Sequence, residues 1–245
     1  MAEAHGAIVP VGRPTYGIDA PNILVGLIAA AIFLLLVGFF FAAGRSPAFG
    51  VLPWVLSAVL AVAAAWVVHG ARRAKPRAWR AALDALQLTG TEQSLDLGCG
   101  RGLVLVETAK RLPAGHATGI DIWRNRDQSG NRRVTTELNA RIEGVADRVT
   151  VRDADMASLP FGDATLDLVT ASFSLRSSAV AAEREQALDE AFRVLRPGGR
   201  IVVLDDAHTA EIARHLRELG AMDVERSSLL LGFAPPARLV TARRP

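Results

Sequence analysis

A glycine-rich turn at residues 95–102, with the sequence LDLGCGRG, contains the residue types best suited to binding a small ligand. Gly98, Gly100 and Gly102 permit a sharp backbone turn and leave no Cβ between the backbone and a ligand. The helix pattern that follows offers free N–H groups at its start. The Asp96 carboxylate would repel a pyrophosphate but suits an ammonium group, and the G-x-G-x-G spacing differs from the dinucleotide fingerprint. The turn therefore favours a ligand that carries an amino group, with an ordinary strand–helix turn as the alternative.

Further acidic residues stand where predicted strands end. Asp121 lies in the strand pattern Ala117–Ile122, about twenty residues beyond the glycine turn, where a carboxylate fits a ribose diol. Asp155 follows the strand pattern Val149–Asp153 and can accept a hydrogen bond from an adenine amino group, while the N–H of Met156 meets a ring nitrogen. Each acid alone would also fit a helix cap or a loop. Together with the amino-binding turn, they favour S-adenosylmethionine as the ligand.

Strand and helix patterns alternate from residue 94 to the end of the chain. The predicted strands are Ser94–Leu97, Ala117–Ile122, Val149–Asp153, Leu166–Phe173, Arg200–Asp205, Val224–Leu231 and Arg238–Ala242. The predicted helices between them are Leu103–Leu112, Val134–Gly144, Val180–Leu195 and Ala210–Leu219. This alternation predicts an α/β fold with a doubly wound, mostly parallel sheet, to which the last pair adds one antiparallel strand. A ligand of such a sheet binds at the carboxyl ends of the strands.

Residues from about 90 to 242 resemble the class I S-adenosylmethionine-dependent methyltransferases, and their pattern is most similar to the ubiquinone/menaquinone biosynthesis methyltransferase-like group. The matching segments are LDLGCGRG at 95–102, GID at 119–121, DMASLPF at 155–161, LDLVTASFSLR at 166–176 and EAFRVLRPGGRIVVLDD at 190–206. The resemblance implies a Rossmann-like, seven-stranded sheet. It also implies methyl transfer from S-adenosyl-L-methionine, with S-adenosyl-L-homocysteine as the product.

The resemblance also assigns roles to individual residues of the cofactor site. The methionine end would be lined by residues of the glycine turn: Asp96, Gly98, Cys99, Gly100 and Gly102. After the second strand, Asp121 and Ile122 would hold the ribose and adenine. Asp155 and Met156, after the third strand, would meet the adenine edge, and Ser172 of the fourth would lie near the methyl group.

Two features depart from the family pattern. The polar loop at residues 123–131 is longer than that junction needs. It folds over the cofactor, meets the membrane, or is simply solvated. The fourth strand is followed by SFSL rather than an N-P-P-[YF] element, which argues against amino-methylation of DNA bases or glutamine.

Residues beyond the fifth predicted strand are the candidates for proton transfer. His208 is a candidate general base, with Asp205 or Asp206 to orient it, because a histidine titrates near neutral pH. A surface histidine at the start of a helix is the alternative. The single cysteine, Cys99, excludes an intrachain disulfide, and the five histidines lack metal-ligand spacing. We expect no metal.

Two uncharged runs precede this domain, Ile23–Ala43 and Val51–Val68. Each is close to the roughly 20 residues that a membrane-spanning helix needs. The segment 44–47 between them is only long enough for a tight turn, so the pattern predicts a transmembrane hairpin, with a buried helical pair or a cleaved signal peptide as alternatives. A row of small residues in the second run would close the hairpin or pair two chains into a homo-oligomer. The row consists of Ser57, Ala61 and Ala65.

A basic cluster follows the second run and consists of Arg72, Arg73, Lys75, Arg77 and Arg80. Such a cluster stays on the cytoplasmic side, which places both termini and the domain in the cytoplasm beneath the inner membrane. The cluster also accounts for much of the net charge of +3, so we expect no nucleic-acid partner. The arginine bias over lysine is typical of bacterial, GC-rich coding.

The chain divides into four parts: a cytoplasmic tail at 1–21, the hairpin at 22–70, a basic linker with an amphipathic helix at 71–89, and the cofactor-binding domain at 90–245. The amphipathic helix, Pro76–Leu88, presents Trp79, Leu83 and Leu86 on one face. That face packs on the domain core or lies in the membrane interface.

The predicted hairpin favours a methyl acceptor that is dissolved in the bilayer, such as a quinone-like ring, a phenol, a thiol or a lipid headgroup. The apolar segment Leu229–Pro236 would rim the open side of the site. Four other functions remain open. They are a membrane-tethered scaffold or sensor that binds the cofactor without catalysis, a protein methyltransferase at the membrane, and a nucleotide-sugar or a dinucleotide enzyme.

Overall fold

The computed structural model of the chain describes residues 12–19, 21–44, 48–124, 127–177 and 180–245. Its centre is one seven-stranded sheet in the order β3-β2-β1-β4-β5-β7-β6. The first five strands are parallel, and β7 runs antiparallel to both β5 and β6. The strands are β1 (Gln93–Leu97), β2 (His116–Asp121), β3 (Val149–Asp153), β4 (Leu166–Ser172), β5 (Leu195–Asp205), β6 (Met222–Arg226) and β7 (Arg238–Arg243). The predicted doubly wound sheet with one antiparallel strand is confirmed.

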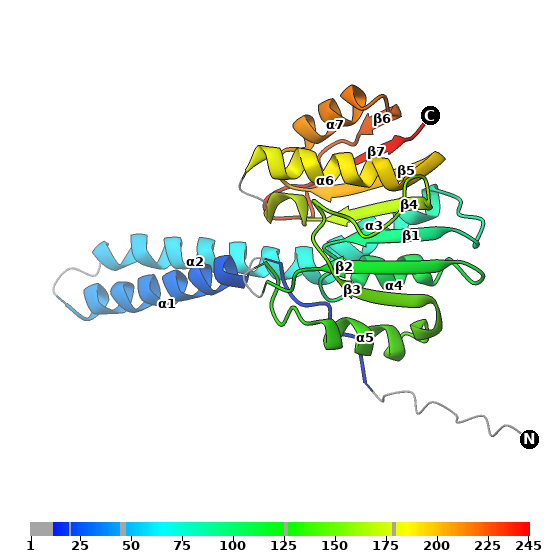
Figure 1. Cartoon of the computed structure of the whole chain (residues 1–245). Coiled ribbons are helices and arrows are strands. Elements are labelled where there is room, and N and C mark those ends of the chain that lie inside the picture. Colours follow the sequence, from blue (N-terminus) through cyan, green and yellow to red (C-terminus); the bar gives the residue numbers. More distant parts are fainter. Residues whose placement is uncertain (1–11, 20, 45–47, 125–126, 178–179) are drawn as a thin grey trace, which may run out of the picture.

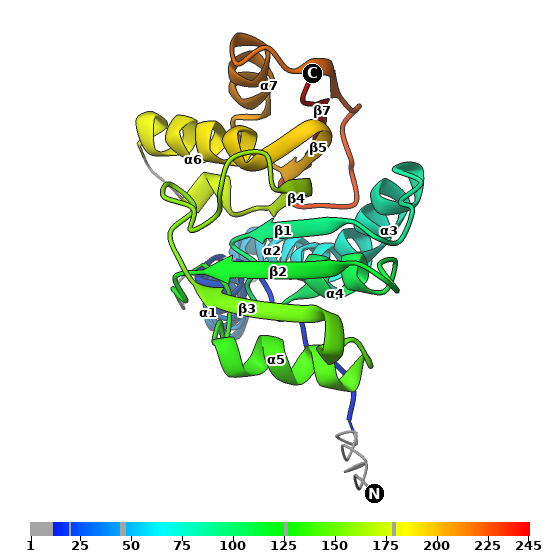
Figure 2. The same cartoon turned by 45° about the vertical axis from the view of Figure 1, so that its right-hand side comes forward.

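Helices cover both faces of this sheet because side chains alternate along each buried strand. On β4, Leu168 packs with the helices of one face, whereas Val169 belongs to the core beneath the other. The first face carries α3 (Lys75–Ala85), α4 (Leu103–Ala109) and α5 (Arg133–Ile142), and the second carries α6 (Ala181–Val194) and α7 (Thr209–Glu218). Figure 2 shows the two layers on either side of the strands.

The sixth strand is shorter than the sequence predicts. Strand β6 ends at Arg226, and Leu230 beyond it forms an isolated antiparallel bridge with Ala237. The carbonyl of Leu231 instead accepts a hydrogen bond from Trp66 Nε1 at 3.3 Å. The sequence pattern predicts a strand up to Leu231, but the regular pairing ends five residues earlier, at Arg226.

The two apolar runs form an antiparallel helical hairpin that projects from the domain (Figure 1), with α1 at Pro21–Ala43 and α2 at Ala48–His69. The helices approach closely at Gly38, where a Cβ would lie 2.3 Å from the Trp54 ring. Ser57 Oγ donates to the carbonyl of Ala31 at 2.7 Å, which ties the helices together. Of the predicted small-residue row, Ser57 closes the hairpin, whereas its other two members are exposed.

A π-helical turn at Gly70–Ala74 joins α2 directly to α3, so one continuous helix runs from the hairpin into the domain. Trp79 and Leu83 of α3 are fully buried in the domain core. The amphipathic helix therefore packs on the sheet, and placing Trp79 in the membrane interface is wrong. The chain segment 231–233 lies against the π-helical turn, where a Cβ on Gly70 would touch the Gly232 carbonyl.

The segment at residues 12–19 docks against the domain instead of forming a separate tail. Thr15 N donates to Asn139 Oδ1 at 3.0 Å, and Ile18 and Ser129 exchange two further hydrogen bonds, each at 3.1 Å. Tyr16 Oη donates to Glu143 of the residues that follow α5 at 3.0 Å. These contacts carry Asp19 to the edge of the sheet where the parallel strands end.

Candidate active site

An open cavity, here called the strand-end cavity, lies at the carboxyl ends of β1, β2, β3 and β4. Nine of the ten predicted cofactor residues line it: Asp96, Gly98, Cys99, Gly100, Asp121, Ile122, Asp155, Met156 and Ser172. The tenth, Gly102, lies just behind the cavity wall as the residue that precedes α4. The structure thus brings together residues from the ends of four strands, β1 to β4, as a ligand site in this kind of sheet requires.

The glycine turn is tight for two reasons. Gly98 and Gly100 both have a positive φ, at 63° and 52°. A Cβ on Gly98 would lie 2.5 Å from the Ser174 Cβ, and one on Gly100 would lie 2.5 Å from Gln128 Oε1. An L side chain at either position would meet both backbone strain and a steric clash. The turn therefore stays close to its neighbours and leaves backbone N–H groups beside the cavity.

Asp96 is a buried carboxyl group on the floor of the cavity. Burial raises its pKa to about 7, although the Thr170 hydroxyl, the charge of Lys75 and the Leu105 N–H each pull it down. Thr170 Oγ1 donates to Asp96 Oδ1 at 2.8 Å. A buried carboxyl group of this kind ionises more readily when a cation reaches it. The site therefore fits the ammonium group of an amino-acid tail.

Asp121 is held rigidly at the end of β2. Its carboxylate accepts from Gly100 N at 2.8 Å, from Trp123 N at 2.6 Å and from Asn131 Nδ2 at 3.2 Å. Asn131 also lines the cavity, and its buried Oδ1 has no hydrogen-bond partner among the described residues. A buried acceptor without a donor is costly, and a ligand hydroxyl would satisfy it. These two side chains together fit a ribose diol.

The remaining predicted residues take simpler positions. Asp155 is exposed at the rim and its Oδ1 accepts from Ala157 N at 2.9 Å, which fixes the turn around Met156. Ser172 Oγ accepts from Trp79 Nε1 at 2.9 Å, so α3 supports the wall beside β4.

Several residues that line the cavity were not predicted from the sequence. Asp127, Gln128 and Asn131 of the polar loop line the cavity. There Gln128 Oε1 accepts from Arg101 N at 2.8 Å, while its Nε2 donates to Asp19 Oδ1 at 3.0 Å. Asp19 also forms an ion pair with Lys75 at 2.8 Å. Lys75 was read as part of the juxtamembrane cluster, yet it is buried against the site.

The predicted proton-transfer residues do not assemble. His208 does not line the strand-end cavity. His208 directly precedes α7 and has a φ of 55°. Its Nδ1 lies 3.1 Å from Oε2 of Glu211, in the first turn of that helix. Asp206 forms an ion pair with Arg176 instead of orienting the histidine. Asp205 is buried, which raises its pKa, and its Oδ1 accepts from Asp206 N at 2.8 Å. This geometry does not support His208 as a base for a ligand in the cavity.

Comparison with known families decides what kind of domain this is. Residues 95–203 match the model described as "Methyltransferase domain". Residues 95–203 form a methyltransferase domain of the class I, S-adenosylmethionine-dependent type. The matched region of this methyltransferase chain spans β1 to most of β5 and so includes the glycine turn and every predicted cofactor residue. It excludes the hairpin and the docked segment at 12–19.

Curated relatives share only this part of the chain. The ubiquinone/menaquinone biosynthesis C-methyltransferase UbiE of Roseobacter denitrificans is 36% identical over 130 residues, which cover 53% of this chain and 48% of the relative. The demethylmenaquinone methyltransferase of Lactiplantibacillus plantarum is 38% identical over 131 residues, covering 53% and 52%. The methyltransferase chain thus spans about half the length of the curated relatives it matches.

Solved structures show the same fold at low sequence identity. The [4+2]-cyclase SpnF is 23% identical with a TM-score of 0.59, covering 71% of this chain and 82% of its own. A geranyl diphosphate C-methyltransferase from Streptomyces coelicolor A3(2), solved with Mg²⁺, geranyl diphosphate and S-adenosyl-L-homocysteine, is 18% identical with a TM-score of 0.55 and coverages of 72% and 80%. A cyclase among these structures means that the fold alone does not fix the reaction.

Proposed function

We propose that this protein is a membrane-integrated methyltransferase that transfers the methyl group of S-adenosylmethionine to an apolar acceptor dissolved in the bilayer. The observation that carries the proposal is the direct junction between the strand-end cavity and the apolar hairpin. Lys75 lines the cavity from α3, and α3 continues α2 without a break. A site built for a soluble acceptor has no need of that connection.

The surface of the hairpin supports integration into a membrane. Helices α1 and α2 contain 23 and 22 residues, and large apolar side chains cover their outer faces. Phe40 is 77% exposed and Leu52 is 65% exposed. Each fully exposed side chain of this kind costs about 1.5–3 kcal/mol in water relative to burial, so lipid is the favourable surroundings for such a face. A buried helical pair would not leave these residues uncovered.

The orientation follows from the charges at the base of the hairpin. Arg72, Arg73 and Arg77 are exposed just beyond α2, whereas α1 and α2 contain no Asp, Glu, Lys or Arg. Positively charged flanks stay on the cytoplasmic side of a span. With two spans, the segment at 12–19 lies on that side too, consistent with its docking on the domain.

The cofactor fits the residues that line the strand-end cavity. Asp96 would hold the ammonium group, and Asp121 with Asn131 would hold the ribose hydroxyls. When bound, the cofactor supplies a methyl carbon on a sulfonium; its transfer to the acceptor leaves a neutral thioether, and the acceptor loses one proton. The protein aligns donor and acceptor, which is the main requirement when the donor is already reactive. Phe173 and Lys75, both on the cavity wall, face the space left for the acceptor.

The class of acceptor is supported by the relatives. The Roseobacter denitrificans relative is named for ubiquinone/menaquinone biosynthesis, and the Lactiplantibacillus plantarum relative is named for demethylmenaquinone. A reduced quinone ring with a prenyl tail combines an apolar body with ionisable hydroxyl groups, and it resides in the bilayer. We therefore favour a quinol-like ring over a lipid headgroup, a thiol or a protein side chain.

The test uses the full-length protein in lipid nanodiscs. Calorimetry with S-adenosylhomocysteine should show binding, and NAD should show none. Incubation of the protein with methyl-labelled S-adenosylmethionine and bacterial membrane extract should then place the label in the organic phase. Label found only in protein or RNA would refute a bilayer acceptor. Binding without transfer to any fraction would favour a scaffold or sensor.

A further inference from the structure

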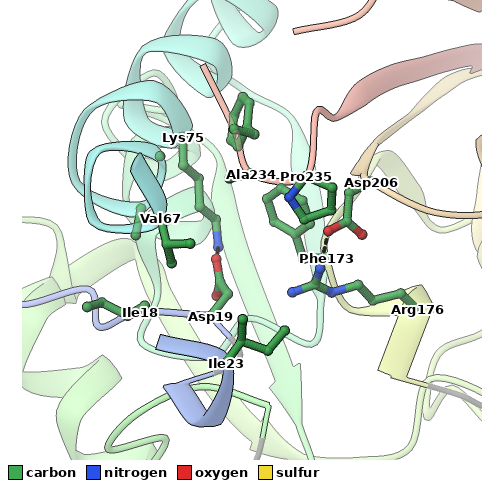
Figure 3. A pocket seen from close by; sticks show the side chains of 13 residues that line it. Ile18, Asp19, Ile23, Val67, Lys75, Phe173, Arg176, Asp206, Ala234 and Pro235 are labelled. Atoms are coloured by element: carbon green, nitrogen blue, oxygen red, sulfur yellow. Dashed lines mark hydrogen bonds and ion pairs between the residues drawn. The ribbon is translucent and has the colours of Figure 1, made fainter. Parts of the chain in front are cut away.

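A second pocket, here called the hairpin pocket, lies between the base of the hairpin and the domain (Figure 3). Ile23 of α1 and Val67 of α2 form its membrane side. Phe173 and Arg176, which follow β4, form its domain side, and Phe233 to Pro235 close it from the segment between β6 and β7. Most of these walls are apolar. The predicted rim at Leu229–Pro236 thus contributes its last residues to this pocket.

The hairpin pocket borders the strand-end cavity. Asp19, Lys75 and Phe173 line both spaces, so these three residues form the wall that the two spaces share. The ion pair between Asp19 and Lys75 stands in that wall. A molecule in the hairpin pocket would therefore reach the cofactor by displacing flexible side chains, without any movement of the sheet.

Two ion pairs are set into these apolar walls. Lys75 pairs with Asp19, Arg176 pairs with Asp206, and Figure 3 shows Phe173 between the two pairs. Lys75 Nζ lies 5.3 Å and Arg176 Cζ 4.9 Å from the centre of the Phe173 ring. Partly buried ion pairs are expensive to desolvate and add little to stability. Phe173 also has a φ of 56°, a strained conformation for a bulky residue, and such strain concentrates at functional sites.

We propose that the hairpin pocket is the acceptor site and that the acceptor enters it from the bilayer between the cytoplasmic ends of α1 and α2. This inference rests on the proposed function. The occupant is an amphipathic molecule with an ionisable ring hydroxyl and an apolar tail. Its ring packs on Phe173, its oxygen approaches Lys75, and its tail leaves past Ile23 and Val67 toward the lipid. A cation beside a ring hydroxyl favours the ionised, more nucleophilic form.

The binding test does not depend on methyl transfer. The full-length protein is placed in vesicles of phosphatidylcholine and phosphatidylglycerol with an alkylphenol that carries a photoreactive diazirine near its ring. After illumination, mass spectrometry should find the label near Ile23, Val67 and Phe233. Because phospholipid is in large excess, labelling by the phenol shows that lipid alone does not fill the pocket. Label confined to the outer faces of α1 and α2 would overturn the proposal.

A matched pair of variants on α2 locates the site. Val67→Trp places an indole in the pocket, whereas Val62→Trp places the same group on the outer face, where Val62 is 66% exposed. Val67→Trp should reduce labelling and methyl transfer by about tenfold, equivalent to about 1.4 kcal/mol, and Val62→Trp should change neither. Ile23→Trp, at a second pocket residue that is 56% exposed, should repeat the loss. Equal behaviour of Val67→Trp and Val62→Trp would refute the inference.

Binding of S-adenosylhomocysteine separates this inference from the proposed function. All three tryptophan variants should bind it with wild-type affinity, which also shows that they are folded. If the wild-type protein binds no S-adenosylhomocysteine or transfers no methyl group, the proposed function fails while the labelling result still stands. If it transfers methyl groups and Val67→Trp does so equally, only the hairpin pocket is excluded.

The contact between Lys75 and the acceptor oxygen can be tested separately by absorbance spectroscopy. An alkyl nitrophenol, whose absorbance reports ionisation, should have a lower pKa when bound to the wild-type protein than in vesicles alone. Lys75→Met should abolish that difference and Lys75→Arg should restore most of it, because the positive charge is what lowers the pKa. No difference between wild type and Lys75→Met would exclude Lys75 as the group that meets the acceptor oxygen.

Discussion

The pKa of Asp96 makes the binding of S-adenosylhomocysteine depend on pH. In the ligand-free protein, burial raises this pKa to about 7. The ligand ammonium group requires the ionised carboxylate, so a proton must leave before binding at lower pH. The ionised fraction is about 0.9 at about pH 8 and about 0.09 at about pH 6, given one titrating group with this pKa. Affinity should therefore fall about tenfold as the pH drops from about 8 to about 6.

The assay is calorimetry on the full-length protein in nanodiscs, repeated in buffers of different ionisation enthalpy to count protons. At about pH 6, binding should release close to one proton. Asp96→Asn should bind S-adenosylhomocysteine more weakly than the wild type at pH 8, and its affinity should not change between pH 8 and pH 6. Asp155→Asn removes an exposed carboxyl group of the same cavity, and its affinity should depend on pH as the wild-type affinity does. A flat wild-type profile, or a slope that survives in Asp96→Asn, would refute the reasoning.

Three further changes test the structure. Gly100→Ala adds a Cβ where φ is 52°, which introduces about 1–2 kcal/mol of backbone strain. It should lower S-adenosylhomocysteine affinity in the same calorimetric assay, and unchanged affinity would show that the turn relaxes. Trp79→Phe removes the 2.9 Å hydrogen bond to Ser172 and should lower thermal stability by about 1 kcal/mol, measured by thermal unfolding in detergent. Gly38→Leu collides with Trp54 and should separate α1 from α2, which a distance measurement between spin labels on the two helices would detect.

The cofactor cavity was largely predictable because its residues are local in sequence. A strand, a glycine turn and a following helix all lie within residues 93–109, so Asp96 and the turn glycines could be placed without knowing the rest of the fold. Asp121 and Asp155 followed from the rule that parallel strands deliver their carboxyl ends to one edge. What the sequence did not show was how tightly Asp121 is held by Asn131, because that contact depends on the path of the polar loop.

Residues that reach the site from outside the sheet were harder to predict. Lys75 was grouped with exposed arginines by charge, although it stands four residues before Trp79 and eight before Leu83 on the same helical face. This helical spacing from two apolar residues was the feature of the sequence that could have predicted the burial of Lys75. Nothing comparable marks Asp19, which arrives through backbone contacts of the docked segment. His208 was placed by its distance after β5, but its left-handed backbone and Glu211 turn the ring away.

The unbroken helix from Ala48 to Ala85 determines how this protein meets its surroundings. One end is clamped inside the domain by Trp79 and Leu83, so the catalytic half cannot tumble independently of its anchor. Under the proposed function, encounters with a bilayer-dissolved acceptor would take place by lateral diffusion, in two dimensions and at a fixed height. A short local search would then replace capture from bulk water.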